Sequence, residues 1–243
     1  MVKEWRILEN INLIFTTFTW SYIENLRKTL SAILKDVSVY LLLCVGTFLM
    51  LRTIMQYSGL NNNVGFLREK QDYIHLDIWM IAFYVHVFSS IFSLLAGFTQ
   101  FSNYVLTHHR KLHRTIGKIY AVNVIFINFP AGFIMAIYAN GFLPSKIAFL
   151  ILDCLWLLFT LKAVIEIRKK NVNAHKNFMI RSYALTCSAV TLRSWKLILS
   201  NLFVIDPVAL YMIDAWLGFV PNLFFAEWLI RRKKINVRTQ HSP

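Results

Sequence analysis

Several apolar segments, each longer than about 18 residues, constrain the fold of this chain more than any other feature. A helix needs about 20 mostly apolar residues to cross the hydrocarbon of a bilayer, and buried helices of soluble proteins are usually shorter. The composition agrees, because 57% of the residues are hydrophobic and only 16% are charged, whereas about 25% is usual in soluble domains. The sequence therefore predicts an all-α, multispanning membrane protein.

Six such segments divide the chain. The predicted transmembrane helices are about 37–55, 78–101, 115–139, 145–166, 177–202 and 208–230. Pro130 lies within the third and is expected to kink it. Residues 1–36 interleave aromatic side chains with Lys and Arg, which predicts an amphipathic segment of one or two helices at the membrane surface; the alternative is a short helix packed on the bundle. Residues 37–230 then form the membrane domain, and residues 231–243 form a basic tail.

Positive charge is concentrated at one side of the predicted bundle. The net charge is +14, and Lys and Arg number five in residues 1–37, four in 102–118, four in 166–178 and five in 231–243. With six spans these segments share one side, which the positive-inside rule assigns to the cytoplasm together with both termini. Because short loops and the chain ends carry this charge, we expect the lipid bilayer as partner and no nucleic acid.

The cysteines and the N-terminus give two further expectations. Cys44, Cys154 and Cys187 lie in apolar runs and form no CxxC motif, so we expect neither a zinc site nor structural disulfides. The first residues lack the apolar core and cleavage site of a signal peptide, so Met1 is expected to stay attached. The oligomeric state does not follow from the sequence.

The stretch Asn173–Lys196 combines an apolar helix pattern with charge. One face carries His175, Ser182, Thr186, Ala189 and Arg193, at intervals of 7, 4, 3 and 4, which match the helical repeat. Arg181 and Lys196 add two more charges. Charge is costly in hydrocarbon and is usually paired or functional. We therefore expect partners for these groups on other helices.

Two other predicted spans carry similar stripes. The second has His86, Ser90, Ser93, Gly97 and Gln100, at intervals of 4, 3, 4 and 3. The third begins with His113, Gly117, Tyr120 and Val124, and Tyr120 is expected among the buried polar partners. Small residues in such stripes let a neighbouring helix approach closely.

Helical rise places these polar groups at two depths. Because the third and fifth spans both start on the cytoplasmic side, His113 and His175 should share one level, and Arg181 should lie roughly one turn into the fifth span. The inner cluster predicted there comprises Gln100, His113, Arg114, His175, Arg181 and Glu227. Within it, Glu227 is the expected partner of Arg181.

A second cluster is predicted in the outer half. His86 should lie about 12 Å from the outer side, and Arg193 about 24 Å along its span from the inner side. This outer cluster comprises His86, Asp153, Arg193, Lys196 and Asp214. Arg193 has Asp153 or Asp214 as its expected partner, although an Arg–Asp pair can also serve only to tie helices together.

The motifs also resemble a known family. One motif is His86 followed by Gly97 and Gln100-Phe101; the others are HRTIGKIY from His113, HKNFMIRSYAL from His175 with a later TLR ending at Arg193, and AWLGFVPNLFFAEW from Ala215 to Trp228. Over about residues 78–230 this resembles domain-of-unknown-function family 2306, a family of bacterial six-span membrane proteins. Lys176 stands where that family more often has Arg. The resemblance implies the bacterial inner membrane as location and assigns no activity.

Four functions are compatible with these clusters. The first is a haem-binding or redox protein, in which His113 and His175 ligate a b-type haem and arginines, Arg181 or Arg193, face its propionates. The layout resembles di-haem transmembrane cytochromes, but the predicted fourth span has no histidine. His86 therefore lacks a clear axial partner, for which Met80 and Met135 are the candidates.

The other three functions use the same residues differently. A proton-coupled carrier would use His86, Asp153, Arg193 and Asp214 as a buried relay, although the sequence shows neither an inverted repeat nor paired broken helices. A small membrane enzyme acting on a lipid or quinone would grip an anionic head group with His113, His175 and Arg181. The last alternative is a non-catalytic assembly factor. The sequence does not decide whether the chain is an enzyme or which residues would be catalytic. For the first function, a membrane redox protein is a further expected partner.

Overall fold

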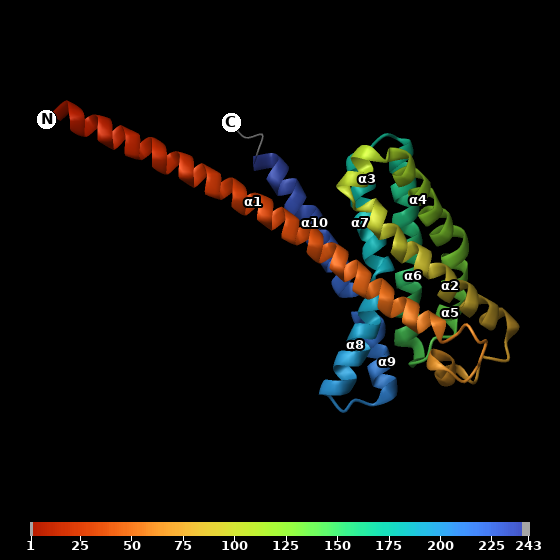
Figure 1. Cartoon of the computed structure of the whole chain (residues 1–243). Helices are drawn as coiled ribbons and strands as arrows, with labels where there is room; N and C mark the ends of the chain where they lie inside the picture. The colour runs from red at the N-terminus through yellow and green to blue at the C-terminus, as the bar shows by residue number, and fades with distance from the viewer. Residues whose placement is uncertain (1, 240–243) are drawn as a thin grey trace. The chain divides into compact units, whose positions relative to one another are not determined.

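The computed structural model describes the backbone of residues 2–239 and the side chains of residues 19–31, 33–34 and 37–232. Within residues 2–239 the regular elements are all helical. They are α1 (Val2–Met55), η1 (Gly65–Lys70), α2 (Asp77–Gln100), α3 (Asn103–His108), α4 (Arg110–Val122), η2 (Asn123–Asn128), α5 (Phe129–Ile137), α6 (Phe142–Arg168), α7 (Val172–Thr186), α8 (Ser188–Leu202), α9 (Pro207–Leu217) and α10 (Val220–Thr239) (Figure 1). The predicted all-α class is confirmed.

The chain divides into two units, at Val45 and Gly46. The first unit, Met1–Val45, is the greater part of α1, which continues as one helix to Met55. The helix has no break at residues 36–37, where the sequence places a boundary. The location of residues 1–36 at a membrane surface and the basic tail at 231–243 stay predictions.

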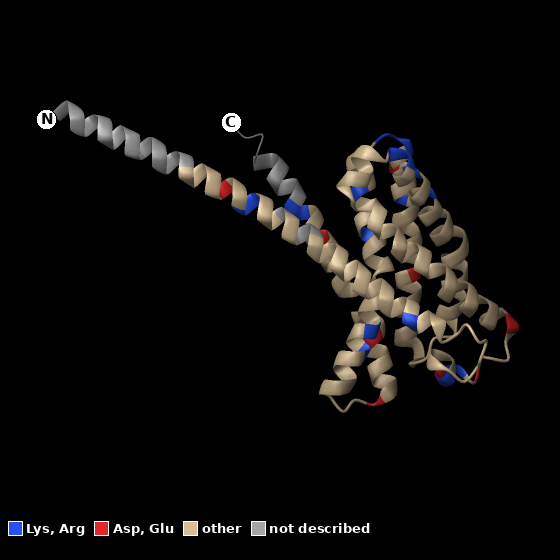
Figure 2. Cartoon of the chain, viewed as in Figure 1, with Lys and Arg blue, Asp and Glu red and all other residues tan. Residues whose placement is uncertain are grey.

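The second unit, Gly46–Pro243, is a helical bundle with α6 near its centre. Helix α6 packs along α7, while α2 contacts α4, η2 and α5. One end of the bundle carries α3 and the α6–α7 connection, and is called here the α3 end; the opposite end carries η1, and is called the η1 end (Figure 1). Lys and Arg are frequent at the α3 end, and further charged residues lie along the helices between the two ends (Figure 2).

Within the part of the chain that the structure describes, five helical segments are long and apolar enough to cross a membrane. They are Val37–Met55, Asp77–Gln100, Arg110–Ile137, Phe142–Arg168 and Pro207–Arg232. Large apolar side chains such as Phe92, Phe126 and Phe224 are exposed on these segments, as expected for faces turned to lipid. The chain is therefore an integral membrane protein with several membrane-spanning helices.

The predicted fifth span, about 177–202, is the one that this set lacks. The structure builds it from two shorter helices, α7 and α8, which meet at Cys187. Each has 15 residues, fewer than the ~20 that cross a bilayer alone. The count of six spans stays a prediction, in which α7 and α8 together form one interrupted crossing.

Local sequence explains where several helices begin. Asn171 caps α7 through a 3.2 Å hydrogen bond from Ala174 N to its Oδ1, and Asp206 accepts from two backbone amides at the start of α9. Side-chain acceptors at this position satisfy amides that have no partner within the helix. Before α6, Gly141 adopts a positive φ of 75°, a conformation that glycine tolerates best.

A wide turn interrupts the third span ahead of Pro130. Residues Asn123–Asn128 form a π-helix, in which Phe129 N bonds Val124 O. Proline has no amide hydrogen and clashes with the carbonyl one turn earlier, which disfavours ordinary helix before it. The interruption expected at Pro130 therefore takes the form of the π-helix η2, and α4 and α5 continue across it as one apolar segment.

Candidate functional site

A cavity of about 560 Å³ opens between the helices in the half of the bundle nearer the η1 end. Its wall is formed by α2, α5, α6, α8 and α9, with η1 and residues 50–57 closing the η1 end. Apolar and aromatic side chains, among them Phe83, Met135, Leu152 and Trp156, make up much of the lining. A mostly apolar cavity of this size with a few convergent polar groups is typical of a small-molecule site.

Three helices place polar groups at one point of this wall. His86 of α2 and Asp153 of α6 both lie against Gly132 of α5, where an added Cβ would be 2.9 Å from Asp153 Oδ1 and 3.4 Å from His86 Cε1. Asp153 is 6% exposed, and its Oδ2 makes no hydrogen bond to any described residue. His86 Nδ1 lies 3.4 Å from Asn128 O, at the end of η2. A side chain in place of Gly132 would therefore push the imidazole and the carboxyl group apart.

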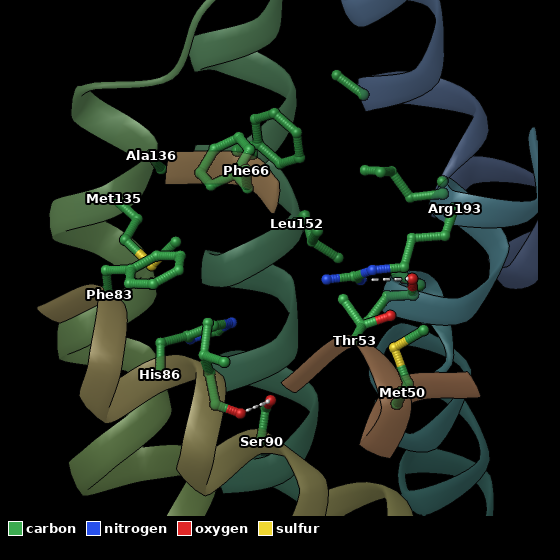
Figure 3. A pocket seen from close by; sticks show the side chains of 18 of the residues that line it. Met50, Thr53, Phe66, Phe83, His86, Ser90, Met135, Ala136, Leu152 and Arg193 are labelled. Atoms are coloured by element: carbon green, nitrogen blue, oxygen red, sulfur yellow. Dashed lines mark hydrogen bonds between the residues drawn. The ribbon is translucent and has the colours of Figure 1, made fainter. Parts of the chain in front are cut away.

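Arg193 extends from α8 into the cavity from the opposite wall (Figure 3). Its guanidinium lies on the same side of the cavity as Leu152 and turns towards the region of His86 (Figure 3). Its Nη1 donates a 2.9 Å hydrogen bond to Ala189 O, and it forms no ion pair with any described residue. A guanidinium has five N–H donors, so most of this hydrogen-bonding capacity is available to a bound molecule.

Two more charged groups from α8 and α9 line the cavity near η1. Asp214 is 2% exposed, and neither carboxyl oxygen is hydrogen bonded to a described residue. Lys196 donates to Glu69 across 3.0 Å. Glu69 belongs to η1, so this ion pair links η1 to α8.

The structure thus brings all five residues of the predicted outer cluster to one cavity. His86, Asp153, Arg193, Lys196 and Asp214 all line it. The expected pairing is wrong in detail, because Arg193 forms no ion pair with Asp153 or Asp214, while Lys196 pairs with Glu69. Sequence reasoning missed Glu69, because it lies in a connecting segment whose path no helical spacing reveals. A role in ligand binding for these residues stays a prediction.

Two helix interruptions also border the cavity. One is the break at Cys187 between α7 and α8, where Thr186 and Ser188 line the wall; the other is the turn between α9 and α10, where Gly218 lines it. Gly218 lies close to α8, since an added Cβ would be 3.0 Å from Leu192 Cβ. No paired broken helices were found in the sequence. Gly218 and Pro221 are the residues that could have indicated the interruption between α9 and α10. Interrupted helices around a site within the membrane are a recurrent feature of carriers.

The residues of the predicted inner cluster come from α2, α4, α7 and α10. Gln100 Nε2 donates to His113 O across 3.1 Å, which ties the end of α2 to α4. His175 Nδ1 lies 2.9 Å from Ala163 O of α6. His113 is close enough to His175 and Arg114 for their charges to interact, and its Nδ1 is buried without a hydrogen bond to a described residue.

Arg181 and Glu227 form the ion pair that the sequence predicts. Arg181 donates from Nε to Glu227 Oε1 and from Nη2 to Oε2, the second across 2.9 Å. The guanidinium also lies 5.3 Å from the ring centroid of Phe178. This pair links α7 to α10, and Nε and Nη2 of Arg181 are both used in it.

A hydrogen-bonded group of hydroxyls lies between the two clusters. Tyr120 Oη is 2.7 Å from Ser182 Oγ and 2.9 Å from Thr186 Oγ1, and accepts from Trp156 Nε1. Ser182 Oγ is in turn 2.7 Å from Thr160 Oγ1. These hydroxyls are buried and join α4, α6 and α7. We call Thr186, Tyr120, Ser182 and Thr160 the hydroxyl chain.

Lys70 holds η1 against the end of α5. It is 1% exposed, and its Nζ donates to Tyr138 O and, across 2.7 Å, to Asn140 Oδ1. The rings of Phe66 and Tyr73 lie 5.5 and 5.1 Å from Nζ. Burial lowers the pKa of Lys70 from 10.5 to about 8. Sequence reasoning treated this residue only as part of a polar loop.

The lowered pKa of Lys70 predicts a pH-dependent stability. Between pH 8 and 10.5 the unfolded chain binds the proton and the folded chain does not, so stability rises with pH in this window. We expect the free energy of unfolding of the native protein, relative to Lys70→Met, to increase over that range in thermal or denaturant unfolding. Lys111→Met is the control, because Lys111 is exposed on α4. The difference in unfolding free energy between the native protein and this variant should not change over the same pH range. If the difference in unfolding free energy between the native protein and Lys70→Met does not change with pH, the lowered pKa of Lys70 is contradicted.

The residues at the α3 end fit the predicted haem only in part. His175 bonds a backbone carbonyl through Nδ1, which is how an axial histidine is commonly oriented. About two turns inward from His113 and His175, however, Tyr120 and Ser182 fill the interior with their mutual hydrogen bond. Arg181 is bound by Glu227. Among the described residues, no group of three or more His, Cys, Asp or Glu side chains is placed to hold a metal ion.

Comparison with known proteins places the chain in a family. Residues 83–230 match the family described as "Predicted membrane protein (DUF2306)". The chain therefore belongs to this family of membrane proteins, whose function is not known. No curated protein and no solved structure is similar enough to count as a match. The matched segment contains α4 to α9 in full and most of α2, and so nearly all of the helices that surround the cavity.

Proposed function

We propose that the protein is a proton-linked membrane carrier for a small amphipathic molecule with an anionic head group, bound in the cavity. The observation that carries this proposal is the cavity itself, whose mostly apolar wall also contains His86, Asp153, Arg193 and Asp214. The apolar lining accepts a hydrocarbon or ring body. The polar groups then fix one end of the molecule.

The charge of the head group follows from Arg193. Its guanidinium reaches into the cavity and has no carboxylate partner among the described residues. A carboxylate or phosphate can accept two parallel hydrogen bonds from a guanidinium, which is among the stronger polar contacts in proteins. The nearby Lys196 is already paired with Glu69, so Arg193 is the main anion-binding group.

Proton linkage follows from the carboxyl groups. Asp153 and Asp214 are buried and have carboxyl oxygens without hydrogen bonds to the described residues. Ionisable groups within a membrane protein commonly mark ion or proton pathways. Uptake of a proton by Asp153 or His86 changes the charge beside Arg193, and thereby the affinity for an anion.

Binding of a fluorescent carboxylic acid tests the proposal. We expect purified protein in nanodiscs to bind dansyl-undecanoic acid more tightly than its uncharged methyl ester. Arg193→Gln should weaken binding of the acid about tenfold or more, because a hydrogen bond to a charged group contributes about 1.5–3 kcal/mol. Binding of the ester should change little.

Arg168→Gln serves as the matched control. Arg168 is an exposed arginine at the end of α6 and does not line the cavity. This variant should bind the acid as the native protein does. Equal affinity of the native protein and Arg193→Gln for the acid would contradict the proposal.

The haem function is a second candidate, supported by one contact. The bond from His175 Nδ1 to Ala163 O leaves Nε2 of the same ring for an iron atom. A Soret band in the purified protein that is lost in His175→Ala would favour haem at the α3 end. A colourless, folded protein made with ample haem would count against it. Because the residues there fit only in part, we rank the carrier function first.

A further inference from the structure

We propose that the hydroxyl chain carries protons between the α3 end of the protein and the cavity. Its members Thr186, Tyr120, Ser182 and Thr160 come from three helices. This inference rests on the proposed function, because the cavity's titratable groups are where the protons arrive or leave. It also joins the two polar clusters, which are otherwise separate.

The hydrogen-bond geometry suits proton transfer. Successive oxygens are 2.9, 2.7 and 2.7 Å apart from Thr186 to Thr160, close to the usual length of an O–H···O hydrogen bond. In each of the three contacts either oxygen can be the donor. Every hydroxyl can both donate and accept. Thr160 Oγ1 also donates to Trp156 O, and Thr186 Oγ1 to Ser182 O, so these two hydroxyls must turn away from the carbonyls as a proton enters at one end and another leaves at the other. The hydroxyls then turn back to reset the chain. No bond other than O–H is formed or broken.

Each end of the chain meets a titratable region. At one end, Thr186 lines the cavity. At the other, Thr160 lies one turn of α6 from Ala163, whose carbonyl binds the ring of His175. The three residues from Thr160 to Ala163 rise about 4.5 Å along the helix axis, and in this proposal bridging waters complete the path from Thr160 to His175. His175 is only partly buried and can exchange protons with the surface.

The groups that face the two ends determine how the path responds to pH. The charged side chains around the cavity are His86, Asp153, Arg193, Lys196, Asp214 and Glu69, and the cavity also contains the hydroxyls of Tyr57 and Tyr211. At the α3 end His175 is accompanied by His113 and Arg114. The interior between the two ends contains buried hydroxyls and the indole of Trp156. The hydroxyl chain is therefore a polar path through this interior layer.

Proton movement into liposomes tests this path. The protein is reconstituted with pyranine inside, and a potassium gradient with valinomycin imposes a membrane potential. We expect the native protein to move protons faster than empty liposomes do. Tyr120→Phe keeps the ring but removes the central hydroxyl, and Thr160→Val removes a second one, so both should fall close to the rate of empty liposomes.

Tyr183→Phe is the matched control. Tyr183 is also buried, but its hydroxyl donates to Leu94 O and lies outside the chain. This variant should conduct as the native protein does. Thermal unfolding of each variant identifies those that are folded, and Thr160→Val decides the matter if Tyr120→Phe does not fold.

Three results would overturn the inference. They are a native rate no higher than that of empty liposomes, unchanged rates in folded Tyr120→Phe and Thr160→Val, or an equal loss in Tyr183→Phe. If the hydroxyls only tie helices together, their removal would lower thermal stability and leave the rate of proton movement unchanged. Binding of dansyl-undecanoic acid is measured separately, so protein that conducts protons without binding the acid would refute the carrier function and leave the proton path standing.

Discussion

Gly97→Ala should destabilise the protein by about 3 kcal/mol, because overpacking and the loss of a buried hydrogen bond act together. A Cβ at this position would be 1.9 Å from Tyr183 Oη and 2.3 Å from its Cζ. The tyrosine would have to move, and its hydroxyl would lose the 2.7 Å hydrogen bond to Leu94 O. We expect a clearly lower midpoint of thermal unfolding in detergent.

Gly59→Ala is the matched control for this change. No atom lies within 4 Å of a Cβ at Gly59, so its unfolding free energy should shift by no more than about 0.5 kcal/mol. The combination of Gly97→Ala with Tyr183→Leu should cost less than the sum of the two single changes, since the leucine no longer meets the new methyl group. Native stability in Gly97→Ala would show that α2 and α7 are not in this close contact.

Glu227→Gln should cost about 2–3 kcal/mol, because it leaves the Arg181 guanidinium in a largely buried position without its counter-charge. The side chain of Arg181 is 19% exposed and donates two hydrogen bonds to Glu227. Replacement of both partners, as Arg181→Met with Glu227→Leu, should recover much of the loss, since the guanidinium is then no longer left without a counter-charge. Thermal unfolding of the two single variants and of the double variant gives the coupling energy.

Glu24→Gln is the control for the second prediction. Glu24 pairs with Lys28 across 3.6 Å, and the lysine side chain is 70% exposed. An exposed pair within one helix contributes about 0.5 kcal/mol or less, so this change should have little effect on the free energy of unfolding. If Glu227→Gln changed the free energy of unfolding equally little, the ion pair between α7 and α10 would not contribute to stability.

Helical spacing predicted the parts of the site that depend on local geometry. The five residues of the outer cluster come from α2, α6, α8 and α9, and their depths follow from the rise per residue. The structure places all five around one cavity. The same reasoning predicted the pair of Arg181 with Glu227 and the close helix approach at Gly97.

Contacts made by connecting segments could not be predicted in this way. The pairing of Lys196 with Glu69 and the burial of Lys70 depend on the path of η1, which tertiary packing sets. The break at Cys187 was hidden because the apolar pattern continues across it, so two helices were interpreted as one. Resemblance to a family of unknown function supplied motif residues and could not supply a ligand.

The π-helix η2 determines which face α5 presents to the cavity. A π-helical turn holds an additional residue compared with an ordinary one, so everything after Asn128 is rotated relative to α4. Conversion of this segment to ordinary α-helix without a change in its length would turn α5 by roughly 100°. Gly132 would then leave the point where His86 and Asp153 meet, and a larger side chain would take its place. The register of this single helix, set by one extra residue, therefore decides whether the imidazole and the carboxyl group share a site at all.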